Sequence, residues 1–395
     1  MAGAHLILSV NSGSSSLKFS LYRLTANADA WLADGAVERI GEPDGRFWMR
    51  TAGRESPAPR RGAFLGHSEA MHTAFDALEG LGLPQPEAVG HRVVHGGPEY
   101  SRPQRVDAGL VEALRTLIPL APLHLPSQIQ VMEAIATRSP GLPQVACFDT
   151  AFHRSMPTLA KHLPLPRSLW REGLQRYGFH GLSCEYIVSV LADEARGRVI
   201  IAHLGNGASL TAVRDRASID TTMGFTPSGG LMMGTRTGDL DPGVLLYLMN
   251  EKGYDARGLE GLVDHQAGLL GVSGISSDMK TLLESGDGFA AEAVALFCYQ
   301  ARKHIGALVA VLGGLDTLVF TGGIGEHAAA VRGDICCGFE YLGLRLDTQR
   351  NAVDAPIIST QDSACTVRVI PTNEDLMIAR HSRDCLSAPA VEAAP

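Results

Sequence analysis

A short apolar run that ends in a small, polar turn constrains this chain more than any other feature. Residues 6–10 form the apolar run, and residues 11–16 read Asn-Ser-Gly-Ser-Ser-Ser. Apolar and polar residues then alternate over residues 17–22, which predicts a strand with one buried face. The turn therefore joins two strands. The Gly-rich turn of a P-loop differs, because it leads into a helix and ends in Lys-Ser or Lys-Thr.

The same pattern returns in the second half of the chain. Residues 199–202 are apolar, residues 203–209 read His-Leu-Gly-Asn-Gly-Ala-Ser, and residues 210–213 form another short apolar run. A supersecondary unit that recurs is the mark of an internal repeat. The sequence therefore predicts an α/β protein with two lobes of similar design.

A third loop, at residues 321–326, reads Thr-Gly-Gly-Ile-Gly-Glu and follows the apolar residues 318–320. Here a strand leads into a helix that we expect to begin near residues 328–331. The N–H groups at the start of a helix favour anions, so this loop is a candidate phosphate contact. Three such loops in one chain indicate a phosphate-handling protein more strongly than any one of them.

Length and charge limit the possible functions. The chain has 395 residues, of which 45% are hydrophobic and 19% charged, which suits a globular protein of two domains. Its formal net charge is −8 and it has no basic stripe, which argues against nucleic-acid binding. Phosphate binding would then depend on local cations, namely a few placed Arg or Lys residues and a metal.

Cysteine usage and apolar segments point to the cytoplasm. The seven Cys residues show no CxxC pair and no zinc spacing, which favours reduced thiols, with a redox role for adjacent Cys336 and Cys337 as the alternative. Residues 1–10 lack the basic start of a signal peptide. The apolar residues 291–315 are interrupted at 302–304 by Arg-Lys-His, so we expect a buried amphipathic helix and no membrane span.

Several segments, read in order, resemble the acetate kinase family across nearly the whole chain. The most specific is residues 233–242, Met-Gly-Thr-Arg-Thr-Gly-Asp-Leu-Asp-Pro. The others are residues 10–19, 90–97, 148–153, 177–181, 203–207, 276–279, 322–326 and 373–374. Their common order and spacing make a chance match very improbable.

The resemblance implies a fold and a division of the chain. The family has two duplicated actin-like, or ribonuclease H-like, α/β lobes, with the active site in the cleft between them. The first lobe would contain residues 1–150 and about 376–395 and carry the phosphate, metal and carboxylate groups. The second, residues 151–375, would carry the nucleotide groups and the dimer interface.

The resemblance also implies a reaction, the transfer of the γ-phosphoryl group of ATP to acetate to give acetyl phosphate and ADP. Phosphoryl transfer needs positioning and positive charge, which Arg92 and Arg236 would supply. His180 would stabilise the transition state. Asp149 would orient an Arg or act as the active-site acid/base, and we favour orientation because acetate is already ionised. From the residues alone, surface salt bridges are the favoured explanation of the two Arg residues, a core position is the usual case for a lone His, and a turn-capping role is the ordinary explanation of Asp149.

The resemblance assigns metal and phosphate contacts to the first lobe. Asn11 and Glu374 would hold Mg²⁺, with Mn²⁺ as a substitute. Ser14, Ser16 and Lys18 would face the phosphates, although serines are common in turns for conformational reasons alone. Mg²⁺ takes only one or two protein oxygens in such sites, so it leaves no spacing motif.

The resemblance assigns the remaining contacts to the nucleotide and the acid. The nucleotide set comprises His203, Leu204, Gly205, Asn206, Gly207, Asp278, Met279, Lys280, Gly323, Ile324, Gly325, Glu326 and His327. The substrate set comprises Arg92, Val94, Leu123, His124, Phe179 and Pro227. The small apolar pocket around Val94 predicts a preference for acetate over propionate. It does not predict exclusion of propionate, because a methylene contributes only about 1–3 kcal/mol to such discrimination.

The chain departs from the family pattern at several positions. Cys184 stands where His is usual, Leu125 and Ser127 interrupt a usual His-Asn-Pro segment, Ser228-Gly229 replaces Leu-Glu, and His327 replaces Asn. Ser228-Gly229 lies beside the predicted acyl pocket, so it could loosen that pocket. His327 borders the predicted nucleotide site and could change base preference.

Alternatives and partners complete the prediction. Propionate kinase is the nearest alternative, followed by butyrate kinase, a sugar or polyol kinase of the same superfamily, and a non-catalytic nucleotide-binding module. Arg92 beside apolar residues fits a carboxylate better than a sugar. The resemblance implies a homodimer formed through the second lobe, with acetate or acetyl phosphate and ATP or ADP as ligands, and neither nucleic acid nor membrane as a partner.

Overall fold

The computed structural model of the protein describes residues 4–53 and 58–387. It separates into unit 1, Met1–Ala151 with Asn373–Pro395, and unit 2, Phe152–Thr372. The sequence-based division stands at residue 150 and about residue 376. Two parts of the sequence-based predictions lie outside the described residues. They are residues 1–3, in the segment predicted not to be a signal peptide, and residues 388–395, at the end of the predicted first lobe.

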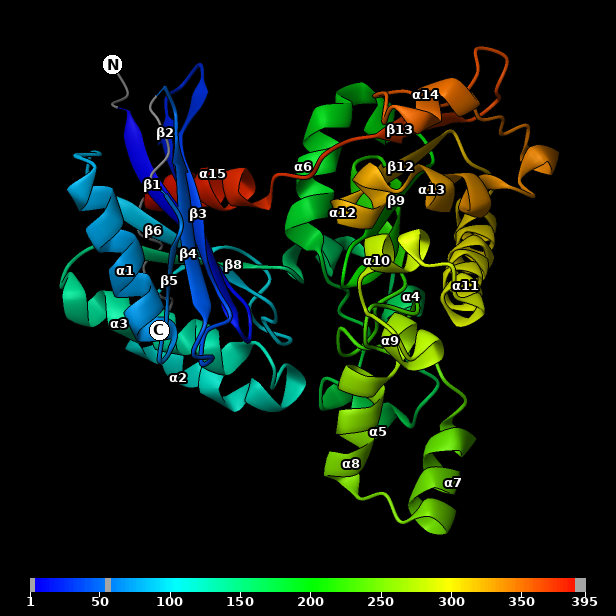
Figure 1. The fold of residues 1–395 in the computed structure, drawn as a ribbon, viewed down its shortest axis with the longest axis horizontal. Helices are drawn as coiled ribbons and strands as arrows, with labels where there is room; N and C mark the ends of the chain where they lie inside the picture. The colour runs from blue at the N-terminus through cyan, green and yellow to red at the C-terminus, as the bar shows by residue number, and fades with distance from the viewer. Residues whose placement is uncertain (1–3, 54–57, 388–395) are drawn as a thin grey trace. The chain divides into compact units, whose positions relative to one another are not determined.

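Unit 1 is built on one mixed sheet (Figure 1). Within the described residues the strand order is β5-β4-β3-β2-β1-β6-β8-β7. β1 pairs antiparallel with β2 and parallel with β6, and β6 pairs parallel with β8. The strands are β1 (His5–Ser12), β2 (Ser16–Leu24), β3 (Asp29–Glu38), β4 (Gly45–Thr51), β5 (Arg60–Gly62), β6 (Ala88–Val93), β7 (Gln104–Arg105) and β8 (Gln144–Phe148).

Unit 2 repeats the central part of that sheet. Its described strands follow the order β11-β10-β9-β12-β13, where β9 is antiparallel to β10 and parallel to β12, and β12 is parallel to β13. The strands are β9 (Val199–Leu204), β10 (Ala208–Arg214), β11 (Ala217–Thr221), β12 (Thr317–Thr321) and β13 (Thr366–Val369). The arrangement matches β3-β2-β1-β6-β8 of unit 1 strand for strand. The predicted duplication of an α/β lobe is therefore confirmed.

Helices cover both faces of the unit 1 sheet. Neighbouring residues of β1 point to opposite sides of the sheet, so each face contributes apolar side chains to a different cluster. Leu8 and Val10 pack in a core with Met71 and Ile135, from α1 and α3. Ile7 packs on the opposite side, in a cluster that includes Ala379 and Leu376 of α15. The unit contains α1 (His67–Gly80), α2 (Ala108–Thr116), η1 (Ile118–Leu120), α3 (Leu125–Arg138) and α15 (Glu374–Ser387), and η2 (Ala151–Ser155) begins at its boundary.

Unit 2 is more helical. One face of its sheet packs on α6, through a core that includes Cys184, Ile187, Ile201 and Val319. The helices and helical turns of the unit are α4 (Thr158–Lys161), α5 (Arg167–Arg171), α6 (Gly181–Leu191), η3 (Ala192–Arg196), α7 (Pro242–Lys252), α8 (Ala256–Glu260), η4 (Gly261–Gln266), α9 (Gly268–Ser273), α10 (Met279–Glu284), α11 (Gly288–Leu312), α12 (Gly322–His327), α13 (Ala329–Cys336), η5 (Glu340–Leu342) and α14 (Thr348–Ala352).

The long helix α11 confirms the amphipathic helix predicted for residues 291–315. Asp287 caps its first turn by accepting from Phe289 N, and Gly313 ends it in the left-handed region at φ 70°. One side is buried through residues such as Phe297 and Ile305. None of the helices within residues 4–53 and 58–387 has the length and apolar character that a bilayer crossing requires.

Candidate active site

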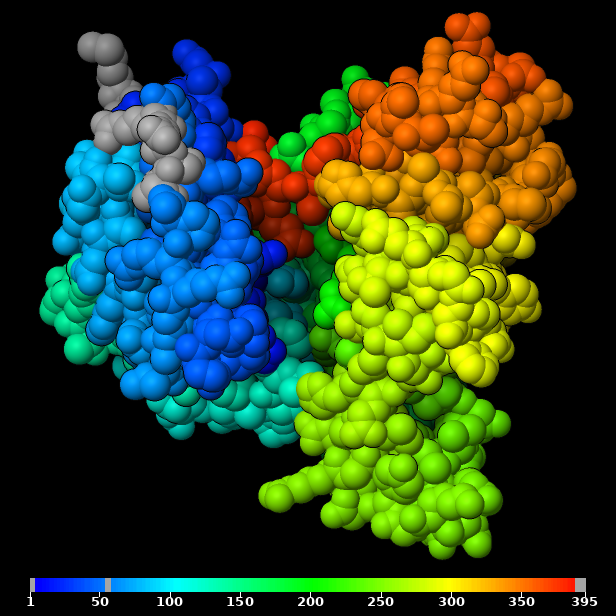
Figure 2. All heavy atoms as spheres, in the orientation of Figure 1, coloured from blue at the N-terminus to red at the C-terminus, as the bar shows by residue number. Residues whose placement is uncertain are grey.

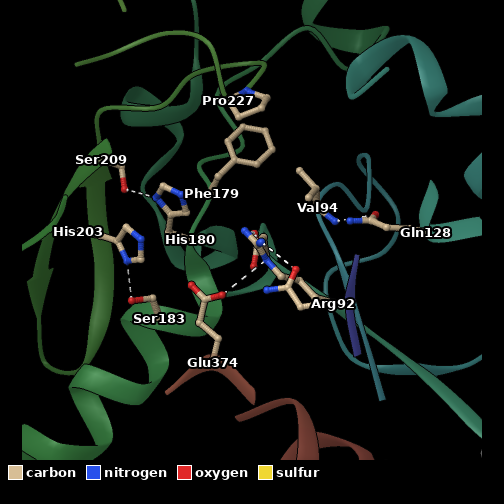
Figure 3. A network of polar contacts seen from close by, with 12 residues as sticks. Arg92, Val94, Gln128, Phe179, His180, Ser183, His203, Ser209, Pro227 and Glu374 are labelled. Atoms are coloured by element: carbon tan, nitrogen blue, oxygen red, sulfur yellow. Dashed lines mark hydrogen bonds and ion pairs between the residues drawn. The ribbon is translucent and has the colours of Figure 1, made fainter. Parts of the chain in front are cut away.

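Arg92 is held in unit 1 by three side-chain hydrogen bonds. Its Nε and one terminal nitrogen donate to Asp149 Oδ2 at 2.9 and 2.5 Å, and the other donates to Asn11 Oδ1 at 3.2 Å. Glu374 Oε2 lies 3.8 Å from Arg92 Nε (Figure 3). Burial opposes the charge on Arg92, but the carboxylates of Asp149 and Glu374 outweigh burial and raise the pKa of the guanidinium. The cluster therefore keeps a permanent positive charge in a fixed orientation.

The strand arrangement explains why these distant residues meet. Asn11 lies at the end of β1, Arg92 near the end of β6, and Asp149 directly after β8, and these three strands are parallel neighbours. Glu374 is the first residue of α15, which packs against the same strands. Parallel strands bring their carboxyl ends to one edge of a sheet, and that edge carries the functional groups in open α/β folds.

The oxygens of Asn11 and Glu374 fit the sparse coordination of Mg²⁺. Asp375 lies beside Glu374 but turns to Ser20, whose hydroxyl donates to it at 2.8 Å, and burial raises the pKa of Asp375 to about 6. Ser12 Oγ is buried and has no hydrogen-bond partner in the described part of the chain, as expected beside a site that a ligand completes. The described residues contain no cluster of three or more His, Cys, Asp or Glu side chains suited to a metal.

Two histidine rings stack in unit 2. The ring centroids of His180 and His203 lie 4.1 Å apart with an interplanar angle of 22°. His180 Nδ1 bonds Ser209 Oγ at 2.9 Å, and His203 Nδ1 bonds Ser183 Oγ at 2.8 Å (Figure 3). His180 has a φ of 58°, a left-handed conformation that costs a residue with a side chain about 1–3 kcal/mol. The surrounding hydrogen bonds hold His180 at the start of α6 in spite of that cost.

Arg236 lies against the same histidine. It donates to the carbonyl of Pro227 at 3.2 Å and contacts Met233 Sδ at 3.7 Å. A Cβ placed on Gly207 would lie 3.4 Å from His180 Nε2 and 3.6 Å from an Arg236 terminal nitrogen. Gly207 therefore lies next to both candidate catalytic residues, and unit 2 brings together two residues that the sequence separates widely.

Thr372, the last residue of unit 2, joins this histidine pair to the third Gly-rich segment. Its hydroxyl donates to Ser183 Oγ at 2.8 Å, and its N–H donates to Glu326 Oε1 at 3.1 Å. The same Glu326 oxygen accepts from Gly322 N at 2.9 Å. Sequence reasoning missed Ser183, Ser209 and Thr372, because small hydroxyl residues carry no spacing signal and their partners lie far away in the chain.

The helix predicted to begin near residues 328–331 is α13, which begins at Ala329, so that prediction is confirmed. The Gly-rich segment before it differs from the prediction, because it forms a six-residue helix of its own, α12, in place of an open turn. The carboxylate of Glu326, from the same helix, already accepts the Gly322 N–H. An internal carboxylate therefore takes one N–H group of the Gly-rich segment that was a candidate phosphate contact.

A cavity of about 680 Å³ lies beside α12 within unit 2. Its walls combine apolar side chains with an amide, a carboxylate, an ammonium and an imidazole, a mixture that suits a nucleoside. The lining residues are Gly205, Asn206, Ser277, Asp278, Met279, Lys280, Leu283, Gly323, Ile324, His327 and Ala328. Of the predicted nucleotide set, His203, Leu204, Gly207, Gly325 and Glu326 lie outside this lining, while Ser277, Leu283 and Ala328 were missed.

Asp278 enters the cavity wall as the N-cap of α10. Its Oδ1 accepts from Thr281 N at 2.8 Å and from Thr281 Oγ1 at 2.9 Å. The Thr281 N–H and hydroxyl bonds lower the pKa of Asp278, so its carboxylate stays charged. Both bonds of the helix cap are made to Asp278 Oδ1. The other carboxylate oxygen, Oδ2, is the acceptor that could take a hydrogen bond from a ribose hydroxyl.

The predicted acyl residues belong to both units. Val94 and Phe179 are buried, and Leu123, His124 and Pro227 are partly buried. In unit 1, Gln128 Oε1 accepts the Val94 N–H at 3.2 Å and fixes that backbone. In unit 2, the segment after Pro227 is anchored, because Ser228 Oγ donates to Asp264 Oδ1 at 2.5 Å.

The other departures and the cysteines also have structural places. Cys184 is buried with its Sγ 3.6 Å from Thr211 Oγ1, and Leu125 is fully buried at the start of α3. All seven Cys residues are free thiols. Burial raises the pKa of the Cys336 thiol, while Cys337 is exposed. A buried thiol with a raised pKa is a poor nucleophile, so the geometry does not favour the redox alternative.

Comparison with known proteins gives matches over nearly the full chain. The model of the acetokinase family matches residues 6–380. An acetate kinase of Rhodopseudomonas palustris is 47% identical over 387 residues, covering 95% of this chain and 97% of the relative. The solved acetate kinase of Porphyromonas gingivalis has a TM-score of 0.86 at 36% identity, covering 97% of this chain and 100% of that one. A solved propionate kinase of Francisella tularensis has a TM-score of 0.89 at 36% identity, covering 96% and 99%.

Proposed function

The chain belongs to the acetokinase family, and on that premise we propose that it transfers the γ-phosphoryl group of ATP to acetate, giving acetyl phosphate and ADP. The observation that carries the proposal is the Arg92 cluster, where a permanent cation is oriented by a buried carboxylate at the edge of the unit 1 sheet. Such a cation suits a carboxylate substrate and a transferring phosphoryl group.

The proposed step is a direct displacement. An acetate oxygen attacks the γ-phosphorus, the bond to the bridging oxygen breaks, and ADP leaves with that electron pair. Negative charge then spreads over the three equatorial oxygens of the phosphoryl group. Arg92, Arg236 and His180 would neutralise this charge, and preorganised donors of this kind are commonly the largest contribution to the rate.

Asp149 acts in this proposal as an orienting residue and not as a general base. Its Oδ2 accepts both bonds from Arg92, and the side chain is completely buried. Acetate needs no deprotonation at neutral pH, since its pKa lies near that of ordinary carboxyl groups. The supporting observation is therefore the two-point contact between Asp149 and Arg92.

Asn11 and Glu374 would hold Mg²⁺, with Mn²⁺ as a substitute. When bound, the metal supplies positive charge to the phosphate chain. Ser14, in the turn after β1, and Ser16 and Lys18, at the start of β2, would contact the phosphates, and Ser14 and Lys18 are exposed to solvent. ATP would place its nucleoside in the cavity beside α12, with Asp278 accepting from the ribose.

Acetate is the proposed acid. The relatives matched by sequence are acetate kinases, although one solved relative is a propionate kinase. Val94 and Phe179 are the buried apolar side chains assigned to the methyl group. The anchored Ser228 supports a defined pocket wall in unit 2 and so a preference for the smaller acid.

A homodimer formed through unit 2 remains part of the proposal, as does a cytoplasmic location. The support for a protein partner is a set of exposed apolar side chains on α7 and α11, the former at the surface of unit 2 in Figure 2. They are Val244, Leu246, Tyr247 and Met249 on α7, and Phe289, Leu296 and Tyr299 on α11. A solution mass near 42.0 kDa, the mass of one chain, would contradict the dimer.

Hydroxylamine trapping of the acyl phosphate tests the reaction. The purified protein is incubated with ATP, Mg²⁺ and acetate, propionate or butyrate, beside an Arg236→Ala variant as the catalytic control. We expect the strongest colour with acetate, less with propionate and a large loss in the variant. More colour with a longer acid would overturn the acetate preference. No colour with any acid from a protein that binds ATP would overturn the reaction itself.

A further inference from the structure

The turn between β1 and β2, taken with its flanking strand residues Ser12 and Ser16 and called loop 12–16 below, offers a row of donors. Ser14 and Ser15 are exposed and Ser16 is partly exposed. Within the part of the chain that the structure describes, no hydrogen bond is made by the N–H groups of Ser14 and Ser15 or by the three hydroxyls. Successive free N–H and O–H donors in a turn form a concave anion site.

Donors alone do not make an anion site, because each residue of the loop also carries a carbonyl oxygen that repels an anion. Two of these oxygens are bonded by backbone N–H groups. Ser16 O accepts from Gly13 N at 2.8 Å, which closes the turn, and Ser15 O accepts from Ile40 N at 2.9 Å.

Two of the three other carbonyls, those of Ser12 and Gly13, are bonded by side chains from helices of unit 1. His67, at the start of α1, donates from Nε2 to Gly13 O at 2.7 Å. Gln128, on α3, donates from Nε2 to Ser12 O at 3.4 Å. The carbonyls of residues 12, 13, 15 and 16 are therefore held by protein donors, and that of Ser14 is not among them. The N–H groups of Ser14 and Ser15 and the serine hydroxyls are left for a ligand.

His67 and Gln128 are both largely inaccessible. Their exposed fractions are 7% and 1%. A carbonyl can only accept, so His67 carries its proton on Nε2 in this contact. Burying a polar side chain has a cost that only a made hydrogen bond offsets, so each residue depends on its loop contact as much as the loop depends on it.

Gln128 is an acceptor as well as a donor. Its Oε1 accepts from Val94 N at 3.2 Å while its Nε2 donates to Ser12 O (Figure 3 shows the Val94 contact). One buried amide therefore spans the loop and a residue assigned to the acyl pocket. His67 has no such second role among the contacts described above.

We propose that His67 and Gln128 are positioning residues that hold the carbonyls of Gly13 and Ser12 away from the terminal phosphoryl group of ATP, and that Gln128 in addition sets the position of Val94. This inference rests on the proposed function. His67 and Gln128 would act on the phosphate contact of loop 12–16 without touching a reacting atom. The ligand class is a phosphoryl group beyond the α-phosphate.

Calorimetric titration of the full chain with ATP and Mg²⁺, and separately with AMP, tests the loop. In His67→Asn the shorter amide cannot reach Gly13 O, so ATP affinity should fall about tenfold while AMP affinity stays within about twofold. In His67→Gln the amide nitrogen replaces Nε2, and ATP affinity should return to within about threefold of the wild type. His72→Asn, the same substitution elsewhere on α1, should change neither affinity.

Gln128→Leu separates the two roles. It should lower ATP affinity as His67→Asn does, and it should also change the propionate-to-acetate ratio of kcat/KM by about threefold to tenfold. His67→Asn should leave that ratio at the wild-type value. Should His67→Asn fail to fold, Gln128→Leu alone still measures ATP against AMP.

Wild-type ATP affinity in His67→Asn, or an equal loss of ATP and AMP affinity, would overturn the role of His67. An unchanged acid ratio in Gln128→Leu would overturn its link to Val94. The wild-type protein is assayed for acyl phosphate in the same series. If it forms none, the proposed function fails, while the ATP and AMP affinities still decide the role of the loop.

Discussion

The hairpin of β1 and β2 in unit 1 and the hairpin of β9 and β10 in unit 2 hold the same place in matching sheets. The first turn consists of Gly13 and two serines, whereas the second, residues 205–207, is Gly-Asn-Gly. A Cβ on Gly207 would be in ordinary van der Waals contact with His180 and Arg236, so the second turn lies directly against a ring and a guanidinium. Equivalent positions thus form a donor loop in one unit and a packing surface beside two candidate catalytic residues in the other.

The groups around the two hairpins differ in charge as well. In unit 1, Arg92 is held by the carboxylates of Asp149 and Glu374. In unit 2, the hydrogen bonds described for His180, His203 and Arg236 are made to uncharged groups, namely hydroxyl oxygens, a carbonyl oxygen and the sulfur of Met233. A charge that loses its buried partner destabilises the fold, whereas a lost neutral hydrogen bond costs less. Unit 1 substitutions should therefore affect stability and rate together, and unit 2 substitutions mainly rate.

Arg92→Leu should have the largest effect. The buried Asp149 carboxylate would lose its cation, so the free energy of unfolding should fall by about 3–5 kcal/mol and the rate by about 10³-fold or more. Chemical denaturation and the hydroxylamine assay measure the two losses. Arg345→Leu breaks an exposed pair with Asp362 and should cost less than about 1 kcal/mol. Equal stability losses in the two variants would contradict the contrast between buried and exposed pairs.

His180→Ala tests the other half of the comparison. The rate should fall by about 10²–10³-fold because a preorganised donor is lost. The unfolding free energy should fall by less than in Arg92→Leu, since the lost partner, Ser209, is neutral. A stability loss as large as that of Arg92→Leu, with the rate preserved, would show that His180 serves the fold and not the reaction.

Acidification probes a property that both units share. Burial lowers the pKa of His153 in unit 2 and of His91 in unit 1 to about 4. The unfolded chain takes up these protons near pH 6.5, so stability falls as pH falls from about 6.5 to 4, by about 3 kcal/mol for each group. In His153→Asn the dependence of unit 2 hydrogen-exchange protection on pH should flatten over this window. His91→Asn should do the same in unit 1. An unchanged slope in either variant would exclude that histidine as the source.

Thr372→Val should have the smallest effect. It removes the hydroxyl that donates to Ser183, and with it the support of His203, so kcat should fall about tenfold with little change in the KM for acetate. Thr372→Ser keeps the donor and should restore most of the rate. Thr366→Val, the same change on β13, serves as the control. An equal loss of kcat in the control would assign the effect to packing and not to the hydrogen bond.

The sequence predicted the repeated fold well, because short-range pattern determines strand and turn. Alternation over residues 17–22 and apolar runs at residues 6–10 and 199–202 correspond to β2, β1 and β9. The third Gly-rich segment was predicted less well. Its glycines suggested an open turn, but the segment forms the short helix α12, in which the Glu326 carboxylate accepts a hydrogen bond from Gly322 N. A contact between a side chain and the start of its own helix is not visible in composition.

The sequence by itself determined the residue types on which the proposed chemistry depends, and its ordered motifs were enough to indicate the family. Only the tertiary structure decided how those residues are held. Asp149 faces Arg92 because β6 and β8 are parallel neighbours, and Thr372 reaches Ser183 although the two are far apart in the chain. His67 and Gln128 meet the first loop from two different helices. Local pattern specifies backbone conformation, but the partners of a buried polar group are set by packing between distant segments, which no local pattern records.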